Sequence, residues 1–256
     1  FRRVLFRSDA NSKLDNFNLS GSVNTAIFSN SYVETSQEQT GADNDFMWHA
    51  VGGVVGSSIN GNRVNFSRIS LNNFSVRGSS YIGGLLGHSG NKSTDIYIIV
   101  DRCSASGLRL NLAATDNKEK YRDALGGFVG KVKEGGVKIY GTENGDHSTT
   151  GEYSLVELSS VLCVDSDRAG AGGLVGYAGN GCEAYDMHVE AASGSTVTIG
   201  GTSVSMVGGI VGSMQPAESK YSSCNAIFSN CVINEINLCA REYAGGIYGG
   251  AHNNDW

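Results

Sequence analysis

Several features that mark common classes of protein are missing from this 256-residue sequence. It contains a single proline, Pro216, which excludes collagen-like and proline-rich linker segments. No apolar run approaches the roughly 18 residues that a membrane-spanning helix needs, so we expect no membrane insertion within this segment. The formal net charge is −6, and no basic run follows the first seven residues, which argues against nucleic acid as a partner.

Helical periodicity is missing as well. Apolar side chains come in short alternating or paired groups bounded by glycine, asparagine and serine, and nowhere repeat at helical spacing over ten or more residues. Glycine, by contrast, is abundant, because the 36 glycines make up about twice the share found in an average protein. The sequence therefore predicts an all-β fold with many tight turns.

One short pattern organises the chain: an apolar residue, two glycines, two apolar residues and a glycine. It occurs six times, at Val51–Gly56, Ile82–Gly87, Leu125–Gly130, Ala171–Gly176, Val207–Gly212 and Ala244–Gly249. Because the first glycines stand at 52, 83, 126, 172, 208 and 245, the period is loose, with a mean of about 39 residues.

A second strand-like segment recurs upstream of each glycine motif. Its copies are Asn30–Val33, Asn73–Val76, Arg102–Ala105, Leu162–Asp165, Met187–Glu190 and Asn230–Ile233. Their distance from the motif differs between copies, which predicts fixed strands joined by loops of variable length.

The length of the repeat favours a parallel β-helix, or β-solenoid, of about six coils with one glycine motif in each coil. Three strands of five or six residues occupy about half of such a unit, and turns take the remainder. The rival is a β-propeller, whose blades need hairpin turns; Asn-Gly pairs at 60–61, 144–145 and 180–181 are too sporadic to supply one per unit.

Stacked coils explain why glycine recurs, since equivalent residues of neighbouring coils lie about 4.8 Å apart and meet the same restriction on space or dihedral angle. The apolar residue after each glycine pair is then expected to point inward. These residues form one predicted buried ladder: Val54, Leu85, Phe128, Leu174, Ile210 and Ile247.

The series of glycine motifs, preceded by strands of the Asn-Cys-x-Val type, resembles the GLUG repeat of large bacterial surface proteins, which include adhesin-like and peptidase-associated polypeptides. The resemblance covers about residues 24–250. It implies a secreted or cell-surface β-solenoid stalk with neighbouring repeats or domains in the parent chain. The extracellular location rests on this resemblance, because the start of the sequence lacks the order of regions that makes a signal peptide.

Both ends look unlike natural domain boundaries. Residues 1–8, Phe-Arg-Arg-Val-Leu-Phe-Arg-Ser, fit no repeat, and we interpret them as a non-native segment derived from an adapter or from sequence assembly. Residues 9–256 then form a single β-solenoid repeat domain. The sequence stops soon after the sixth motif without a polar capping unit, so we expect a fragment truncated at its C-terminus.

Motifs for common catalytic and cofactor sites are absent. None of the histidines, His49, His88, His147, His188 and His252, begins the His-Glu-x-x-His pattern of a zinc peptidase, and we expect them to lie on the surface or in loops. Gly126–Lys131 and Gly170–Gly172 only approach nucleotide-binding patterns and match the repeat instead. We assign no catalytic, cofactor-binding or metal-binding residue and expect no cofactor.

Six cysteines are present, without a Cys-x-x-Cys pair: Cys103, Cys163, Cys182, Cys224, Cys231 and Cys239. We expect Cys103, Cys163 and Cys231 to share one repeat position as buried thiols, since phenylalanine and methionine stand there in other copies. In an oxidising location, Cys103–Cys163 and Cys182–Cys224 are the pairs that stacking brings within disulfide range.

Acidic residues offer the only enzymatic and calcium candidates. Asp101 with Arg102, and Asp165 with Asp167 and Arg168, stand at comparable positions of neighbouring units, where facing carboxylates serve glycoside hydrolysis; solvated turn residues are the simpler interpretation. Asp43–Asp45 and Asp165–Asp167 offer spaced oxygens for calcium, but the later glycine and glutamate of an EF-hand loop are missing.

Loops and aromatic residues supply the candidate binding surface. The longest stretches between strands are Ser36–Trp48, Asp116–Asp123 and Gly141–Glu152, and loops on one side of a repeat array often form its binding face. Six aromatic residues are candidates for stacking on sugars, although aromatics in strands also serve in cores: Tyr32, Phe46, Trp48, Tyr121, Tyr153 and Tyr177.

We therefore expect a non-enzymatic repeat module of a secreted or surface-anchored bacterial protein, which acts as a stalk or as an adhesive surface that contacts host or environmental glycans or surface proteins. The alternatives are a polysaccharide-cleaving β-helix enzyme, either a lyase or a glycoside hydrolase, and a rigid spacer with no ligand.

Overall fold

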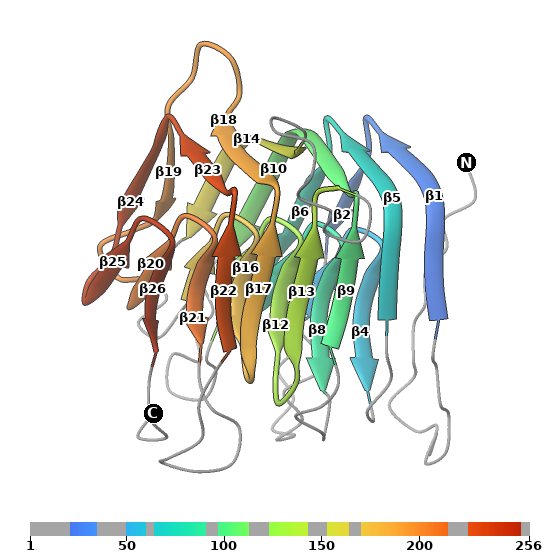
Figure 1. Cartoon of the computed structure of the whole chain (residues 1–256). Coiled ribbons are helices and arrows are strands. Elements are labelled where there is room, and N and C mark those ends of the chain that lie inside the picture. Colours follow the sequence, from blue (N-terminus) through green and yellow to red (C-terminus); the bar gives the residue numbers. More distant parts are fainter. Residues whose placement is uncertain are drawn as a thin grey trace, which may run out of the picture.

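The structure is a computed structural model that describes residues 21–34, 50–59, 64–90, 97–112, 123–142, 153–163, 170–214 and 225–251. Over these ranges the chain is all-β. No helix occurs in them, and so none that is long and apolar enough to cross a membrane. Each strand pairing among these residues is parallel, and the strands stack in chain order from blue β1 to the red strands at the other end (Figure 1).

The largest sheet, here called the long sheet, has twelve strands. Its main path runs in the order β22 (Asn225–Ser229), β17 (Gly181–Tyr185), β13 (Gly136–Tyr140), β9 (Tyr97–Asp101), β5 (Val64–Asn72), β10 (Ser104–Leu112), β14 (Ser154–Cys163), β18 (Met187–Ala191) and β23 (Val232–Asn234). Three further strands join it beside this path: β1 (Gly21–Ser29), β2 (Tyr32–Glu34) and β6 (Ser75–Gly78).

Two six-stranded sheets contain the glycine motifs, and we call them the arch sheets. The first has the order β25 (Tyr243–Gly245), β20 (Met206–Gly208), β15 (Gly170–Gly172), β11 (Ala124–Gly126), β7 (Tyr81–Gly83) and β3 (Ala50–Gly52). The second has the order β26 (Tyr248–Ala251), β21 (Val211–Met214), β16 (Val175–Ala178), β12 (Val129–Val132), β8 (Leu86–Gly90) and β4 (Val55–Ile59). A two-stranded sheet pairs β19 (Val197–Gly200) with β24 (Ile236–Cys239).

Each glycine motif forms a tight arch that links the two arch sheets. Its first glycine ends a strand of one sheet, two residues turn, and the following strand enters the other sheet. The backbones of the two sheets approach so closely that a side chain has no room between them. A Cβ atom on Gly83 would lie under 3.0 Å from the backbone of Leu86 and of Gly130, and one on Gly130 would meet Gly87 in the same way.

In the first five arches, the next arch in the stack leaves no room for a side chain on the second glycine. A Cβ atom on Gly84 would lie under 3.0 Å from the carbonyl oxygen of Gly127, which occupies that space. The same contact recurs from Gly127 to Gly173 and from Gly173 to Gly209. Glycine recurs at this position because the backbone of the next arch occupies the space that a side chain would need. Each further arch of the stack repeats the same contact.

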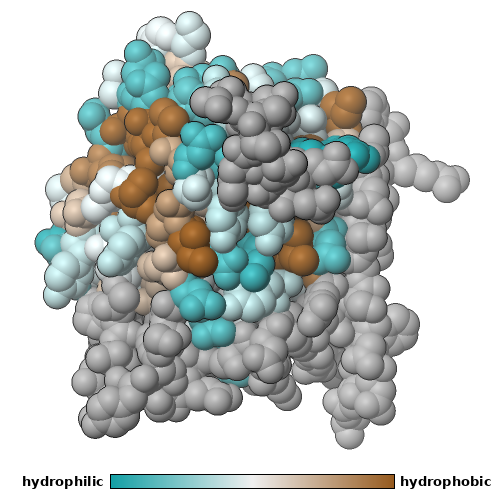
Figure 2. Space-filling model, in the orientation of Figure 1, coloured by the Kyte–Doolittle hydropathy of each residue, from teal (hydrophilic) through white to brown (hydrophobic). Residues whose placement is uncertain are grey.

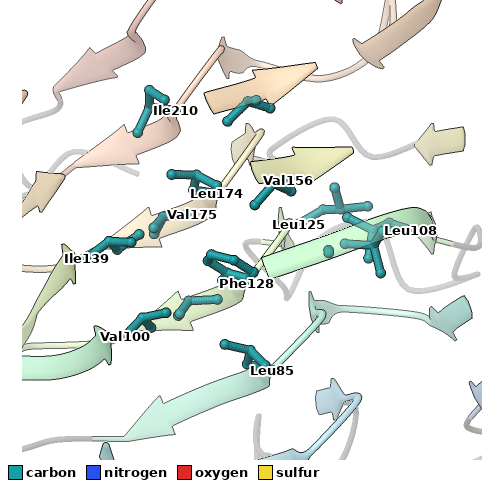
Figure 3. Close-up of a cluster of buried hydrophobic side chains, with 14 of the residues drawn as sticks. Leu85, Val100, Leu108, Leu125, Phe128, Ile139, Val156, Leu174, Val175 and Ile210 are labelled. Atoms are coloured by element: carbon teal, nitrogen blue, oxygen red, sulfur yellow. The ribbon is translucent and has the colours of Figure 1, made fainter. Parts of the chain in front are cut away.

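The apolar residue after each glycine pair points into the interior. Leu85, Phe128, Leu174 and Ile210 are fully buried and lie one above another (Figure 3). The expected burial is confirmed for these four, whereas Val54 and Ile247 at the two ends of the series are partly buried and pack against the same core.

The prediction that the second strand is a single repeat position is wrong, because five of its copies belong to two different corners and Leu162–Asp165 begins at the end of β14 and runs outside the described residues. One corner is formed by Asn30, Asn73 and Gly107, which follow the register partners Ser29, Asn72 and Ser106 and have φ angles of 50°, 47° and 68°. At the other corner the residues with positive φ are Arg68, Arg102, Asp186 and Asn230. Except at Gly107, both corners place a polar residue in the left-handed region before alternating apolar residues, so the two look alike in sequence.

The expected equivalence of Cys163 with Cys103 and Cys231 is also wrong. Cys163 lies at the end of β14 opposite Leu112, and Leu112 is nine residues beyond Cys103 along the chain, on the far side of the corner at Gly107. Met187 lies beside Cys231 in the stack. The residue of β14 that pairs with Met187 is Ser154 and not Cys163. The proposed Cys103–Cys163 disulfide therefore does not form in this fold.

Asp186 joins three layers of the second corner. Its side chain is buried and accepts hydrogen bonds from Thr142 Oγ1 at 2.6 Å and Asn230 Nδ2 at 2.8 Å. Its amide donates to Ser229 O at 3.0 Å, and its carbonyl accepts from the Ser154 amide at 3.0 Å. A buried carboxylate with partners on both sides ties the stacked corners in register.

Candidate functional site

The outer face of β9, β13 and β17 carries a group of aromatic and charged side chains that contact one another. Alternate side chains of these strands face the interior, where Ile98, Val137 and Cys182 are fully buried. The residues between them point outward and are aligned by the parallel register. Ile99 and Asp101 belong to this outward set as well, and we give the name tyrosine face to its tyrosines and its ion pair: Tyr97, Lys138, Tyr140, Glu183 and Tyr185.

The side chains of the tyrosine face contact one another across the strands. The rings of Tyr140 and Tyr185 stack with centroids 5.6 Å apart and planes 14° from parallel. Lys138 Nζ lies 4.5 Å from the centre of the Tyr97 ring and 3.1 Å from Glu183 Oε2. Tyr185 donates a hydrogen bond to the same carboxylate oxygen at 3.4 Å. The face is a connected strip, with partly exposed tyrosine rings held by a central ion pair.

The surroundings of Lys138 and Tyr185 favour the protonated form of both side chains, because each pKa lies above its ordinary value. Partial burial opposes the charge of Lys138, but the hydrogen bond and attraction to Glu183 outweigh it and raise the pKa of the lysine. Partial burial, together with the negative charge of Glu183, raises the pKa of the Tyr185 phenol. Neither group is poised to exchange a proton near pH 7, so the strip suits binding through stacking and hydrogen bonds better than acid–base catalysis.

A second cluster joins the two arch sheets. Tyr81 and His88 of one arch stack with ring centroids 5.0 Å apart, and both are buried. Lys131 Nζ lies 4.5 Å from the Tyr81 ring and 5.3 Å from that of Tyr177, and donates a hydrogen bond to the Tyr81 hydroxyl at 3.2 Å. Ser57 Oγ lies 3.4 Å from His88 Nδ1.

The Ser57–His88 contact does not make a nucleophile and base pair. Burial lowers the pKa of His88 to about 3, and the charges of Lys131 and Lys133 add to this effect. An imidazole that weak cannot take a hydroxyl proton efficiently near neutral pH. The expectation that the histidines lie on the surface or in loops is wrong for His88, which is a buried residue of strand β8.

The low pKa of His88 predicts that acid destabilises the fold. The imidazole protonates near pH 6.5 in the unfolded chain and near 3 in the folded one, so the unfolded state binds the extra proton between these values. We expect this group alone to remove about 2 kcal/mol of the free energy of unfolding as pH falls from 7 to 5. His88→Phe keeps a ring beside Tyr81 but removes the titrating group. Between pH 7 and pH 5, the free energy of unfolding measured with urea should therefore fall by about 2 kcal/mol less in this variant than in the parent. An unchanged slope would contradict the prediction.

Asp101 and Arg102 lie at the second corner and pair with each other. Arg102 Nη2 is 2.8 Å from Asp101 Oδ2, which also accepts a hydrogen bond from Ser67 at 3.0 Å. The carboxylate oxygen is thus engaged by structural partners. The other candidates for hydrolysis and calcium binding lie outside the described residues: Asp43, Asp45, Asp165, Asp167 and Arg168.

The predicted binding aromatics are dispersed. Tyr32 is exposed on β2, Tyr153 precedes β14 with its ring edge-on to His188 at 4.9 Å, and Tyr177 lies beside Lys131. Phe46, Trp48 and Tyr121, with most of the three long loops, lie outside the described residues. The tyrosine face was missed by sequence reasoning, although alternation at positions 97–101, 136–140 and 181–185 carries its signal.

Four thiols of the described chain are free: Cys103, Cys182, Cys231 and Cys239. Burial raises the pKa of Cys103 to about 11, and it also raises the pKa values of Cys182 and Cys231. These three are therefore unreactive core thiols at neutral pH. Cys224, the expected partner of Cys182, lies outside the described residues.

Within the described ranges, no group of three or more histidine, cysteine, aspartate or glutamate side chains is placed to hold a metal ion. Comparison of the chain with protein-family models, with curated proteins and with solved structures finds no match.

Proposed function

We propose that the chain is a parallel β-solenoid of about six coils, each with one glycine motif, and that it acts as a non-enzymatic module of a secreted or surface-anchored bacterial protein. In this role it is a stalk whose outer face contacts glycans. The parallel stacking of the strands and the in-register arches support the solenoid. The bacterial surface location rests on the likeness of the motif series to GLUG repeats.

The tyrosine face is the observation that supports glycan contact. Sugar rings bind to proteins through their apolar faces, which pack on aromatic rings, and through hydroxyl groups, which bond to polar side chains. Tyr140 and Tyr185 offer aromatic surface and phenol groups, and Lys138 and Glu183 offer a donor and an acceptor beside them. The rigid strands hold these groups in position before binding, which lowers the entropic cost of association.

Binding of the 256-residue protein to a panel of mucins, host glycans and plant polysaccharides tests this proposal. For a glycan that binds, we expect the double variant Tyr140→Ala/Tyr185→Ala to lose about 10- to 30-fold in affinity, because each ring contributes about 1 kcal/mol. Tyr153→Ala is the matched control, since Tyr153 is also an exposed tyrosine but lies off the tyrosine face. It should bind like the parent.

Two outcomes would contradict the proposal. Binding that survives the double variant would move the contact away from the tyrosine face. No binding to any member of the panel would favour a rigid spacer without a ligand. Reducing ends are measured in the same wells, because their appearance would instead establish a polysaccharide-cleaving enzyme.

A further inference from the structure

Tyr140 and Tyr185 are placed for a reaction that glycan contact does not require. They are register partners on neighbouring strands, and their ring centroids lie 5.6 Å apart with planes 14° from parallel. Both side chains are partly exposed, and Figure 2 shows hydrophilic and apolar surface side by side over β13 and β17. Two phenol rings that contact each other and meet solvent are a pair that a dissolved oxidant can couple.

Glu183 lies where it can accept the phenol proton of Tyr185. Loss of one electron makes a phenol strongly acidic, so its oxidation is favoured where a base already accepts its hydrogen bond. Tyr185 donates to Glu183 Oε2 at 3.4 Å, and the glutamate is buried. Lys138 Nζ, 3.1 Å from the same oxygen, holds the carboxylate in place beside the phenol. We therefore expect Tyr185 to be the first of the two rings to be oxidised.

The third tyrosine of the tyrosine face, Tyr97, lies away from this pair. The register places Tyr97 opposite Gly136, whereas Tyr140 lies opposite Asp101, four positions further along the strand. The Tyr97 ring packs against Gly136, where a Cβ atom would come within 2.5 Å of Tyr97 Cε1. Lys138 Nζ lies over the same ring, 4.5 Å from its centre. Coupling on this face is therefore expected between Tyr140 and Tyr185.

We propose that Tyr140 and Tyr185 form an oxidative cross-linking site, at which hydrogen peroxide and a haem peroxidase join the two rings through a carbon–carbon bond. Each ring loses one electron and its phenol proton, which passes from Tyr185 to Glu183 and from Tyr140 to water. The two radicals couple at a ring carbon next to each hydroxyl group, and the hydrogen atoms of these carbons move to the phenol oxygens. One molecule of hydrogen peroxide takes up the two electrons and two protons and becomes two molecules of water.

The cross-link fastens one layer of the stack to the next. It joins β13 to β17 and closes a loop of chain that contains β14, β15 and β16. Closure of this loop restricts the unfolded chain and so stabilises the fold, as a disulfide of similar span does. Because the strand register already holds the two rings together, the coupling takes place within one molecule and does not depend on protein concentration.

Treatment of the dilute 256-residue protein with hydrogen peroxide and a haem peroxidase tests the proposal. We expect a monomer that is lighter by two hydrogen atoms and shows dityrosine fluorescence, and from which trypsin releases peptides 139–168 and 169–220 joined together. Tyr140→Phe and Tyr185→Phe keep both rings but remove one phenol, so each should lower the yield of joined peptides about tenfold or more. The urea midpoint of the treated parent should rise, whereas that of either variant should not.

Tyr153→Phe is the matched control, because Tyr153 is an exposed tyrosine of the same peptide 139–168 but lies off the tyrosine face. It should cross-link like the parent. A parent that gains no cross-link, or only cross-linked dimers, would overturn the proposal, and so would joined peptides that persist in Tyr140→Phe or Tyr185→Phe. Glu183→Gln should slow the coupling several-fold at neutral pH, and an unchanged rate would overturn the role given to Glu183.

Discussion

Gly127→Ala is expected to lower the free energy of unfolding by about 3 kcal/mol or more. Its Cβ atom would lie under 3.0 Å from Gly173 O, and the nearest atoms belong to backbone, which cannot rotate away as a side chain can. Gly127 N also donates to Gly173 O at 3.1 Å, so separation of the two arches would cost this hydrogen bond. Because Gly127 lies in the middle of the stack, neither neighbouring arch can shift without disturbing the next.

Urea unfolding followed by circular dichroism measures this loss, with Gly56→Ala as the control. Gly56 is the last glycine of the first copy of the motif, and a Cβ atom there meets only Ala50 O, at an ordinary 3.5 Å. We expect Gly56→Ala to change stability by less than about 1 kcal/mol. Equal effects of the two substitutions would mean that close stacking of the arches does not explain the second glycine.

Phe128→Ala is expected to cost about 3–5 kcal/mol, the usual range for removing a large aromatic side chain from a core. Phe128 is fully buried, and its backbone is held by hydrogen bonds to both neighbouring arches, from Leu85 N at 2.9 Å and to Leu174 O at 2.8 Å. Figure 3 shows its ring between the side chains of Leu85 and Leu174. The fixed backbone prevents the arches from collapsing into the space that alanine leaves.

Phe128→Leu tests whether this loss comes from the cavity. Leucine stands at the equivalent positions 85 and 174, so the interior accepts its shape, and we expect a smaller loss of about 1–2 kcal/mol. Both values come from urea unfolding. A Phe128→Ala protein as stable as the leucine variant would contradict the view that the ladder fills the core.

The glycine motifs could be interpreted from the sequence alone, because the tight turn that each one forms depends on residues next to one another in the chain. Two glycines followed by two apolar residues and a glycine permit one tight turn, and recurrence of the motif demands stacking. The corners were harder to interpret, because Asn73 and Asn230 each follow a polar residue, precede an apolar one and have similar φ angles of 47° and 51°, yet they belong to different corners. Only the register of the strands tells the two apart.

The candidate site shows the same limit. Tyr140 and Tyr185 are 45 residues apart, and nothing in the intervening sequence predicts that their rings stack. Ion pairs across strands, such as Lys138 with Glu183, likewise depend on the register of the strands. The register cannot be read from the sequence, because the loops between strands differ in length. The sequence directed attention to loops and corner aspartates, whereas the tyrosine face lies on the strands β9, β13 and β17.

The amino-acid sequence by itself determined the all-β class, the tight arches and the burial of residues such as Leu85 and Phe128, because these depend on local sterics and on apolar burial at fixed spacing. Tertiary structure alone decided which strands are neighbours, which thiols align, how far the pKa of His88 falls and where Tyr97 meets Lys138. These properties arise from contacts between residues about 30 to 50 positions apart, and such contacts follow from strand register, which loops of variable length leave unspecified.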